Sequence, residues 1–298
     1  SISPKENLIA YAEDTSGRRQ YRLKFKDLEN EEISSFSIEN TSGDMAWSSD
    51  GKYLFYVIRD EETLLPYKLF RHEIGTSQDK DVAIYEEKDT TFYLSVGNTR
   101  SMEYIEVNIS STTSSEVRLI KSDSPDMTPQ IFLPREEDHL YSIDHDPASS
   151  RFLIESNWKA LNFRLLETDL NNSSDKNKWK ELIPHREQVL LQSVVPFPDH
   201  LIIMERENGL RKLKILHKES KAVKEINFND PTYTAYLASN PEYYVDRFYF
   251  GYSSMRTPDS LFSVVLSNGR KRLLKQAEVK GVFSSSDYKV ERKFITAR

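Results

Sequence analysis

The sequence predicts an all-β fold. Short runs rich in Val, Ile, Leu, Tyr and Phe alternate with turns of Gly, Pro, Asn, Asp and Ser, which is typical of antiparallel strands. Residues 43–60 show this pattern, because the polar turn Ser48–Gly51 precedes the apolar run Tyr53–Ile58. We find no long amphipathic helical pattern and no Gly-x-Gly-x-x-Gly after a strand, so alternating βαβ architecture is not expected.

The apolar runs recur in groups of three. The first runs of six groups begin near residues 8, 53, 92, 152, 201 and 248, at steps of 45, 39, 60, 49 and 47 residues. One four-stranded blade of a β-propeller uses roughly 40 to 50 residues. A fourth strand for each group is expected just before its first run, for example at 45–47, 131–133, 190–195 and 235–237. We therefore predict a β-propeller with six recognisable four-stranded blades; the alternative, a β-sandwich, leaves the repeat unexplained.

The composition narrows the classes of function. Basic residues (41) are scattered among acidic ones (47) with a net charge of -6, which disfavours a nucleic-acid-binding surface. The absence of cysteine excludes disulfides, thiolate zinc sites and a cysteine nucleophile. Apolar runs fall far short of the roughly 18 residues of a spanning helix, and residues 1–7 do not resemble a signal peptide. We expect neither membrane insertion nor export.

No motif indicates a catalytic centre. A serine nucleophile usually lies in Gly-x-Ser-x-Gly, and residues 251–255 come closest but lack the second glycine. His139 and His145 flank the acidic residues Asp144 and Asp146, which we interpret as a solvated turn in preference to a metal site. Adjacent carboxylates on a strand point to opposite faces, so they form no acid-base pair. We expect no catalytic residue, no metal and no cofactor in this chain.

A pair of arginines follows a pair of acidic residues near the N-terminus. Arg18 and Arg19 lie across a short predicted turn from Glu13 and Asp14 and precede Tyr21. A surface hairpin with an ion pair, worth at most about 1 kcal/mol, explains this pattern. A functional interface is the alternative.

Several long stretches resemble one family. Residues 12–29, 63–76, 85–96, 111–120, 251–262 and 275–281 are similar, in register along nearly the whole chain, to the propeller of the oligopeptidase B (protease II) group. That group belongs to the prolyl oligopeptidase family of serine peptidases. The resemblance implies a seven-bladed propeller that caps an α/β-hydrolase domain carrying a Ser-Asp-His triad. It further implies cytoplasmic cleavage of short peptides after Arg or Lys, without metal or cofactor.

The resemblance also divides the chain. Residues 1–288 correspond to a partial propeller of about six blades, without the family's first blade, and residues 289–298 to the strand leading toward a hydrolase domain. The family's catalytic triad, and its acidic pocket for the Arg or Lys side chain of the substrate, correspond to no residue of this sequence. Arg18 and Arg19 match the family's paired arginines near the face between the domains, which makes them candidates for an interdomain interface.

The leading functional hypothesis is a noncatalytic, substrate-gating portion of such a peptidase. Its partners would be the hydrolase domain of the same parent chain and short peptides passing to the active site, with no nucleic acid and no membrane. The first alternative is a stand-alone β-propeller that binds a protein partner. The second is an enzyme with an unrecognised site in the central channel.

Overall fold

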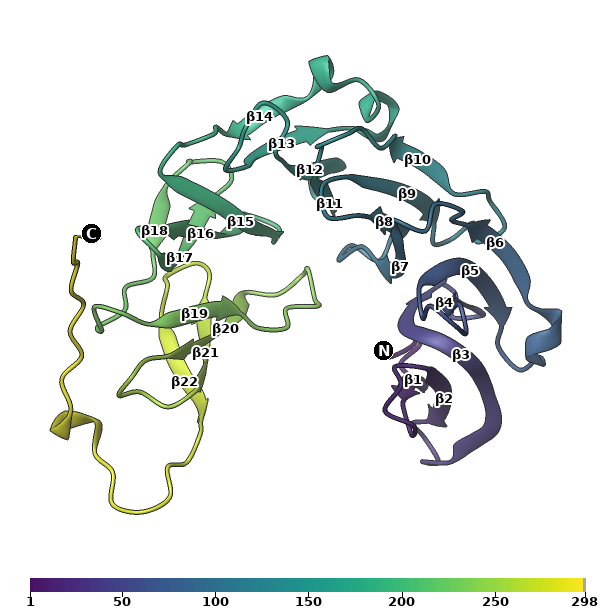
Figure 1. The fold of residues 1–298 in the computed structure, drawn as a ribbon, viewed down its shortest axis with the longest axis horizontal. Helices are drawn as coiled ribbons and strands as arrows, with labels where there is room; N and C mark the ends of the chain where they lie inside the picture. Colours follow the sequence, from purple (N-terminus) through teal and green to yellow (C-terminus); the bar gives the residue numbers. More distant parts are fainter. Residues whose placement is uncertain (297–298) are drawn as a thin grey trace. The chain divides into compact units, whose positions relative to one another are not determined.

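The computed structural model describes residues 1–296, and these form antiparallel sheets with no α-helix (Figure 1). The chain divides into two compact units. The first contains Ser1–His145 and Thr168–Trp179, and the second contains Asp146–Glu167 and the chain from Lys180 onward. Among the described residues, no helix is long and apolar enough to cross a membrane.

The first sheet has six strands in sequence order. They are β1 (Leu8–Glu13), β2 (Tyr21–Asp27), β3 (Ile33–Trp47), β4 (Tyr53–Arg59), β5 (Pro66–Glu73) and β6 (Val82–Glu86). The second sheet contains β7 (Tyr93–Asn98), β8 (Tyr104–Ser110), β9 (Ser115–Lys121) and β10 (Gln130–Leu133).

The third sheet contains β11 (Tyr141–Asp146), β12 (Arg151–Ser156), β13 (Arg164–Thr168) and β14 (Lys180–Ile183). The fourth contains β15 (Val189–Pro196), β16 (His200–Glu207), β17 (Leu210–His217) and β18 (Val223–Glu225). The fifth contains β19 (Thr234–Leu237), β20 (Arg247–Ser253), β21 (Ser260–Val265) and β22 (Lys271–Gln276). Four 3-10 turns complete the described structure: Gln78–Lys80, Leu170–Asn172, Lys176–Lys178 and Ser285–Asp287.

The predicted apolar runs are confirmed as strands, but the prediction of six four-stranded blades is wrong, because the described residues form five sheets. The cause is the 15-residue strand β3. Its first part pairs with β2 and its last part with β4, so two predicted groups share one sheet. Gly43, at φ +95°, lies where the β3–β4 register shifts between Thr41 and Met45. The chain bends there without reversing, and the hydrogen-bonded ladder continues.

The fourth group was also assigned a wrong first strand. Residues 131–133 form part of β10, which pairs with β9 and completes the second sheet. The third sheet begins instead with β11, in a segment interpreted from the sequence as a solvated turn. That interpretation is wrong because His139, His145 and Asp146 are buried.

Apolar side chains fill the space between sheets within each unit. In the first unit, buried residues of β3 to β5 pack against those of β7 to β9, including Phe55, Leu94 and Ile105. In the second unit, β16 and β17 pack against β19 to β21 through Ile202, Leu213 and Phe248, among others. Alternate residues of each strand supply these contacts, as strand geometry requires.

The segment after β22 lies outside the sheets. Among residues 277–296, the structure assigns only the 3-10 turn Ser285–Asp287. The sequence assigned residues 289–298 to a strand leading to another domain; residues 297 and 298 lie outside the described part of the chain. Since the expected partner is not in this chain, the assignment stays a prediction.

Candidate functional site

The two candidate interface arginines lie in the exposed turn between β1 and β2. The carboxylate of Asp14 organises this turn by accepting the backbone N–H groups of Ser16 (3.0 Å), Gly17 (2.8 Å) and Arg19 (2.8 Å). Arg19 has φ +60°, a left-handed conformation that the Asp14 contact supports.

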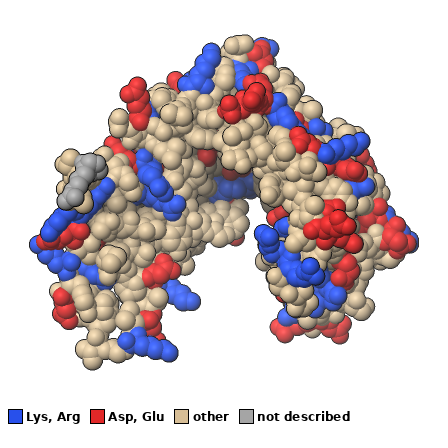
Figure 2. Space-filling view, in the orientation of Figure 1, with Lys and Arg blue, Asp and Glu red and all other residues tan. Residues whose placement is uncertain are grey.

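The acidic residues beside this turn do not pair with the arginines. Glu13 instead forms an ion pair with Lys24, with Oε2 and Nζ 2.6 Å apart. Among residues 1–296, the side chains of Arg18 and Arg19 have no ion-pair partner, so both cations are presented to solvent. Over the visible face, basic and acidic side chains are interspersed (Figure 2).

One serine, one histidine and one carboxylate meet in the first unit, but their geometry does not form a catalytic triad. Ser101 Oγ lies 3.0 Å from His145 Nδ1, and Glu103 Oε2 lies 3.9 Å from the same nitrogen. A triad histidine uses one ring nitrogen for the serine and the other for the carboxylate. In His145 both groups lie at the same nitrogen, Nδ1.

A second histidine-carboxylate pair is buried in the first sheet. His72 Nδ1 lies 2.7 Å from Asp81 Oδ1, and Tyr56 donates its hydroxyl to Asp81 Oδ2 at 2.7 Å. Burial and the Asp81 hydrogen bond raise the pKa of Tyr56. The His72 ring stacks on Phe36 with centroids 4.8 Å apart, and its Nε2 has no hydrogen-bond partner among the described residues. This pair therefore ties β5 to the residue before β6, and both side chains are buried away from solvent.

No group of three or more His, Asp or Glu side chains within residues 1–296 could hold a metal ion.

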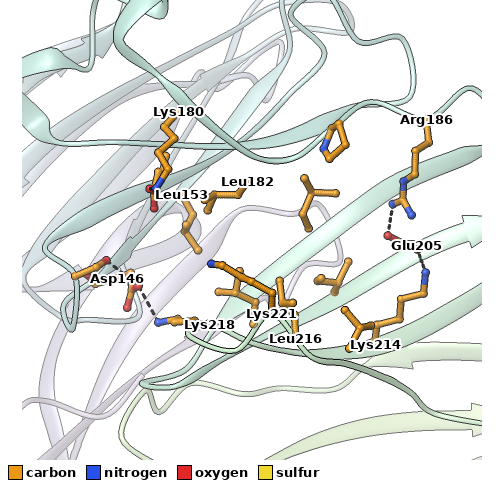
Figure 3. A pocket seen from close by; sticks show the side chains of 17 residues that line it. Asp146, Leu153, Lys180, Leu182, Arg186, Glu205, Lys214, Leu216, Lys218 and Lys221 are labelled. Carbon is orange, nitrogen blue, oxygen red and sulfur yellow. Dashed lines mark hydrogen bonds and ion pairs between the residues drawn. The ribbon is translucent and has the colours of Figure 1, made fainter.

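A pocket of about 610 Å³ in the second unit is suited to binding (Figure 3). Its volume falls within the range of roughly 300 to 1,000 Å³ typical of small-molecule sites. One wall is a single face of the β16–β17 hairpin. Leu201, Ile203 and Glu205 are two residues apart on β16, and strand alternation turns all three toward the pocket. The same spacing places Lys214, Leu216 and Lys218 on the β17 side.

The opposite wall comes from the third sheet. Leu153 of β12 and Leu182 and Ile183 of β14 supply apolar surface, while Glu167 and Lys180 lie at its edge. Glu167 Oε1 and Lys180 Nζ are 2.9 Å apart. The pocket therefore combines an apolar floor with a charged rim.

Two buried carboxylates that line the pocket, Glu205 and Asp146, are already paired with cations. Glu205 accepts hydrogen bonds from Arg186 and from Lys214 Nζ, the latter at 2.6 Å. Burial raises the pKa of Glu205, but these two cations outweigh burial and leave the pKa below its ordinary value. Asp146 accepts from Lys218 Nζ at 2.7 Å and from the hydroxyl of Tyr243.

The lining carries more positive than negative charge. Its five cations are Lys180, Arg186, Lys214, Lys218 and Lys221, and its three carboxylates are Asp146, Glu167 and Glu205. Within residues 1–296, the amine of Lys221 has no ion-pair partner. Figure 3 shows the Lys221 side chain extending into the pocket.

Sequence reasoning missed this pocket. The signal was the alternation of apolar and charged residues along residues 201–205 and 214–218, which identifies one face of a hairpin. Nothing in the sequence indicated that β12 to β14 would leave that face uncovered.

Comparison with known proteins places the chain in a family. Residues 1–277 match the family model described as the prolyl oligopeptidase N-terminal β-propeller domain. The chain is 34% identical over 298 residues to dipeptidyl aminopeptidase BI of Pseudoxanthomonas mexicana, covering 100% of this chain and 40% of that protein. It is also 34% identical over 292 residues to protease 2 of Moraxella lacunata, covering 97% and 41%.

The solved structures agree on the fold. Oligopeptidase B from Leishmania major is similar with a TM-score of 0.90 at 27% identity, over 98% of this chain and 42% of that one. Oligopeptidase B from Trypanosoma brucei, in a closed form with covalently bound antipain, has a TM-score of 0.86 at 24% identity, over 96% and 41%. The chain thus spans about two-fifths of the length of these relatives. It belongs to the prolyl oligopeptidase family, and the part it represents is the family's β-propeller domain.

Proposed function

We propose that this chain is the substrate-gating propeller of a serine peptidase similar to oligopeptidase B, which cleaves short peptides after Arg or Lys. The observation that carries the proposal is the similarity of 98% of the chain to oligopeptidase B from Leishmania major, with a TM-score of 0.90 at 27% identity. Residues 1–277 match the model of the family's N-terminal propeller domain, so we assign the cleavage chemistry to a hydrolase domain of the parent chain.

The propeller would act by exclusion. A rigid all-β cap admits flexible peptides to an enclosed active site and rejects folded proteins. Closure against the hydrolase domain also removes water, which strengthens the electrostatic interactions that stabilise the transition state. The exposed cations Arg18 and Arg19 would contribute to that closed interface. A cytoplasmic location is part of this proposal and follows from the family resemblance; cell fractionation tests it.

The test compares the isolated 298-residue chain with the product of the full gene. Both are given a short fluorogenic peptide ending in arginine and a folded protein with arginines on its surface. We expect the full product to cleave the peptide and spare the folded protein, and the isolated chain to cleave neither. Turnover by the isolated chain that survives further purification would contradict the proposal. A full gene product without peptidase activity would favour a stand-alone binding module.

A further inference from the structure

The pocket between β12–β14 and β16–β18 has features that steric gating does not require. Its floor is apolar, through residues such as Leu153, Leu182 and Leu216. Each carboxylate that lines the pocket forms an ion pair with a cation that also lines it. The pairs are Asp146 with Lys218, Glu167 with Lys180, and Glu205 with both Lys214 and Arg186. The unused charge of the pocket is therefore positive.

That unused charge is concentrated at Lys221. This residue lies in the turn between β17 and β18, where its backbone N–H donates to the carbonyl of His217 at 3.0 Å, and it has φ +59°. The turn fixes the origin of the side chain, which then reaches over the apolar floor (Figure 3). An ammonium next to apolar surface is complementary to a ligand with an anionic group attached to an apolar body.

Two strand edges beside the pocket favour a peptide as that ligand. β14 and β18 are the outermost strands of their sheets, and each pairs with only one neighbour in the described structure. Their residues Leu182, Ile183 and Val223 also line the pocket. An extended peptide placed there has unpaired backbone N–H and C=O groups within its reach, as in recognition by strand addition.

We propose that this pocket binds the C-terminal end of a short peptide whose last residue is apolar. The carboxylate would pair with Lys221, and the terminal side chain would occupy the apolar floor. This inference goes beyond steric gating and does not depend on a hydrolase domain, because every residue it uses belongs to the second unit.

The test is isothermal titration calorimetry of the purified chain with three probes. They are N-acetyl-alanyl-leucyl-leucine, the same peptide with a C-terminal amide, and octanoate. We expect saturable binding of the peptide acid, with the amide about tenfold weaker because it lacks the charge-assisted contact. Octanoate should bind more weakly than the peptide acid, since it cannot pair with a strand edge. Binding of the acid should weaken as salt is raised.

Variants assign the contact. Lys221→Gln should weaken the peptide acid by about tenfold and leave the amide unchanged. Lys224→Gln is the matched control, because Lys224 is close in the chain but its amine donates to the backbone carbonyl of Asn268, at 2.7 Å, and does not line the pocket. Leu182→Ser should weaken acid and amide equally. Both lysines are exposed, so neither replacement is expected to affect folding.

Three results would overturn the proposal. They are no saturable binding of the peptide acid, equal binding of acid and amide, or a Lys221→Gln variant that binds the acid like the unaltered chain. If octanoate binds as well as the peptide acid, the site recognises a simple apolar carboxylate, and the peptide assignment is wrong. None of these outcomes affects the proposed gating function, which is tested by turnover of the full gene product.

Discussion

Two contacts between neighbouring sheets have the same alternation of residues along their strands but differ in packing. In the first unit, β3 to β5 face β7 to β9, and fully buried residues such as Phe55, Leu69 and Leu94 fill the contact. In the second unit, β12 to β14 face β16 and β17, and a smaller apolar cluster is accompanied by the pocket of about 610 Å³. The pocket walls carry long charged side chains such as Glu205 and Lys214 among the apolar ones. Alternation alone therefore does not decide whether two sheets close; the residues at the facing positions do.

The two contacts also differ in how they hold buried charge. In the first unit, Arg135 joins two buried carboxylates, Glu87 and Glu116, and its guanidinium lies 4.1 Å from the centroid of the Phe92 ring. In the second, the single carboxylate Glu205 is held by Arg186 and Lys214. Glu116 also pairs with Arg118, at 2.7 Å, so two cations serve two acids in the closed contact, while two cations serve one acid beside the pocket. The pocket therefore has two surplus cations: one is the second partner of Glu205, and the other is Lys221.

Replacing one leucine by alanine in each of the two contacts should separate their stabilities most strongly. Leu94→Ala should lower the free energy of unfolding by about 3 kcal/mol, because Leu94 is fully buried and its loss leaves a cavity. Leu182→Ala should cost about 1 kcal/mol or less, because Leu182 borders an existing pocket and is only partly buried. Urea unfolding followed by circular dichroism measures both. Equal losses would show that the two contacts are packed alike.

The next largest loss of stability is expected when an arginine that pairs with a buried carboxylate is removed. Arg135→Ala should cost about 2 to 3 kcal/mol, because it leaves the buried carboxylate of Glu87 without a cation, whereas Glu116 keeps Arg118. Arg186→Ala should cost about 1 kcal/mol, since Glu205 keeps Lys214. As a control, adding Glu87→Gln to Arg135→Ala should recover part of the loss. A larger loss for Arg186→Ala than for Arg135→Ala would reverse the comparison.

A third prediction concerns acid sensitivity in the first unit. Burial, assisted by the charge of Lys176, lowers the pKa of His139 to about 4. An unfolded histidine titrates near 6.5, so the unfolded state binds more protons between those values, and stability falls as the pH drops from about 6.5 to about 4. The loss should reach about 1 to 2 kcal/mol, and His139→Gln should make stability less dependent on pH in that window. Thermal unfolding at pH 7, 5.5 and 4 measures it.

Asp230 in the second unit provides the contrasting case. Burial opposes its ionisation, but hydrogen bonds from Ser254, Tyr252 and Arg256 outweigh burial and lower its pKa to about 2. Because the folded pKa lies below the unfolded value, this contribution is complete above about pH 4 and is lost as the pH falls toward 2. Asp230→Asn should therefore leave the slope between pH 6.5 and 4 unaltered. A change of that slope in Asp230→Asn, with none in His139→Gln, would refute both assignments.

The smallest effect on stability is expected at the exposed turn between β1 and β2. Arg18→Ala and Arg19→Ala should each change the free energy of unfolding by less than about 0.5 kcal/mol, because both side chains are exposed and without ion-pair partners in the described structure. In the full gene product, the same changes should lower peptide turnover by weakening domain closure. Unchanged turnover in both variants would remove them from the proposed interface.

Much of the strand content was predictable from the sequence, because runs such as Tyr53–Ile58 combine apolar character with flanking turn residues. The sequence did not predict that β3 would belong to two of the predicted groups. Residues 39–44 have the polar composition of a reversing turn, but the strand continues through them with a bend at Gly43. β11 was missed for a related reason: its polar residues, among them His145 and Asp146, are buried by contacts with distant residues, such as Asp146 with Lys218.

The candidate sites show the same limit. Arg18 and Arg19 were found from their local sequence, and the turn that presents them depends on the neighbouring Asp14. The pocket depends on strands 40 or more residues apart, such as β12 and β17, and on which charged side chains pair. Pairing between distant residues is not encoded in any local pattern, so Lys221 could be recognised only from the structure.

The mass of the native gene product in cells, obtained by immunoblot with an antibody raised against this chain, decides whether the propeller is part of a peptidase. We expect one band more than twice as heavy as the 34.8 kDa of the chain, because the chain covers only about 40% of its peptidase relatives. A single band near 34.8 kDa would contradict it and would make a stand-alone binding propeller the better description.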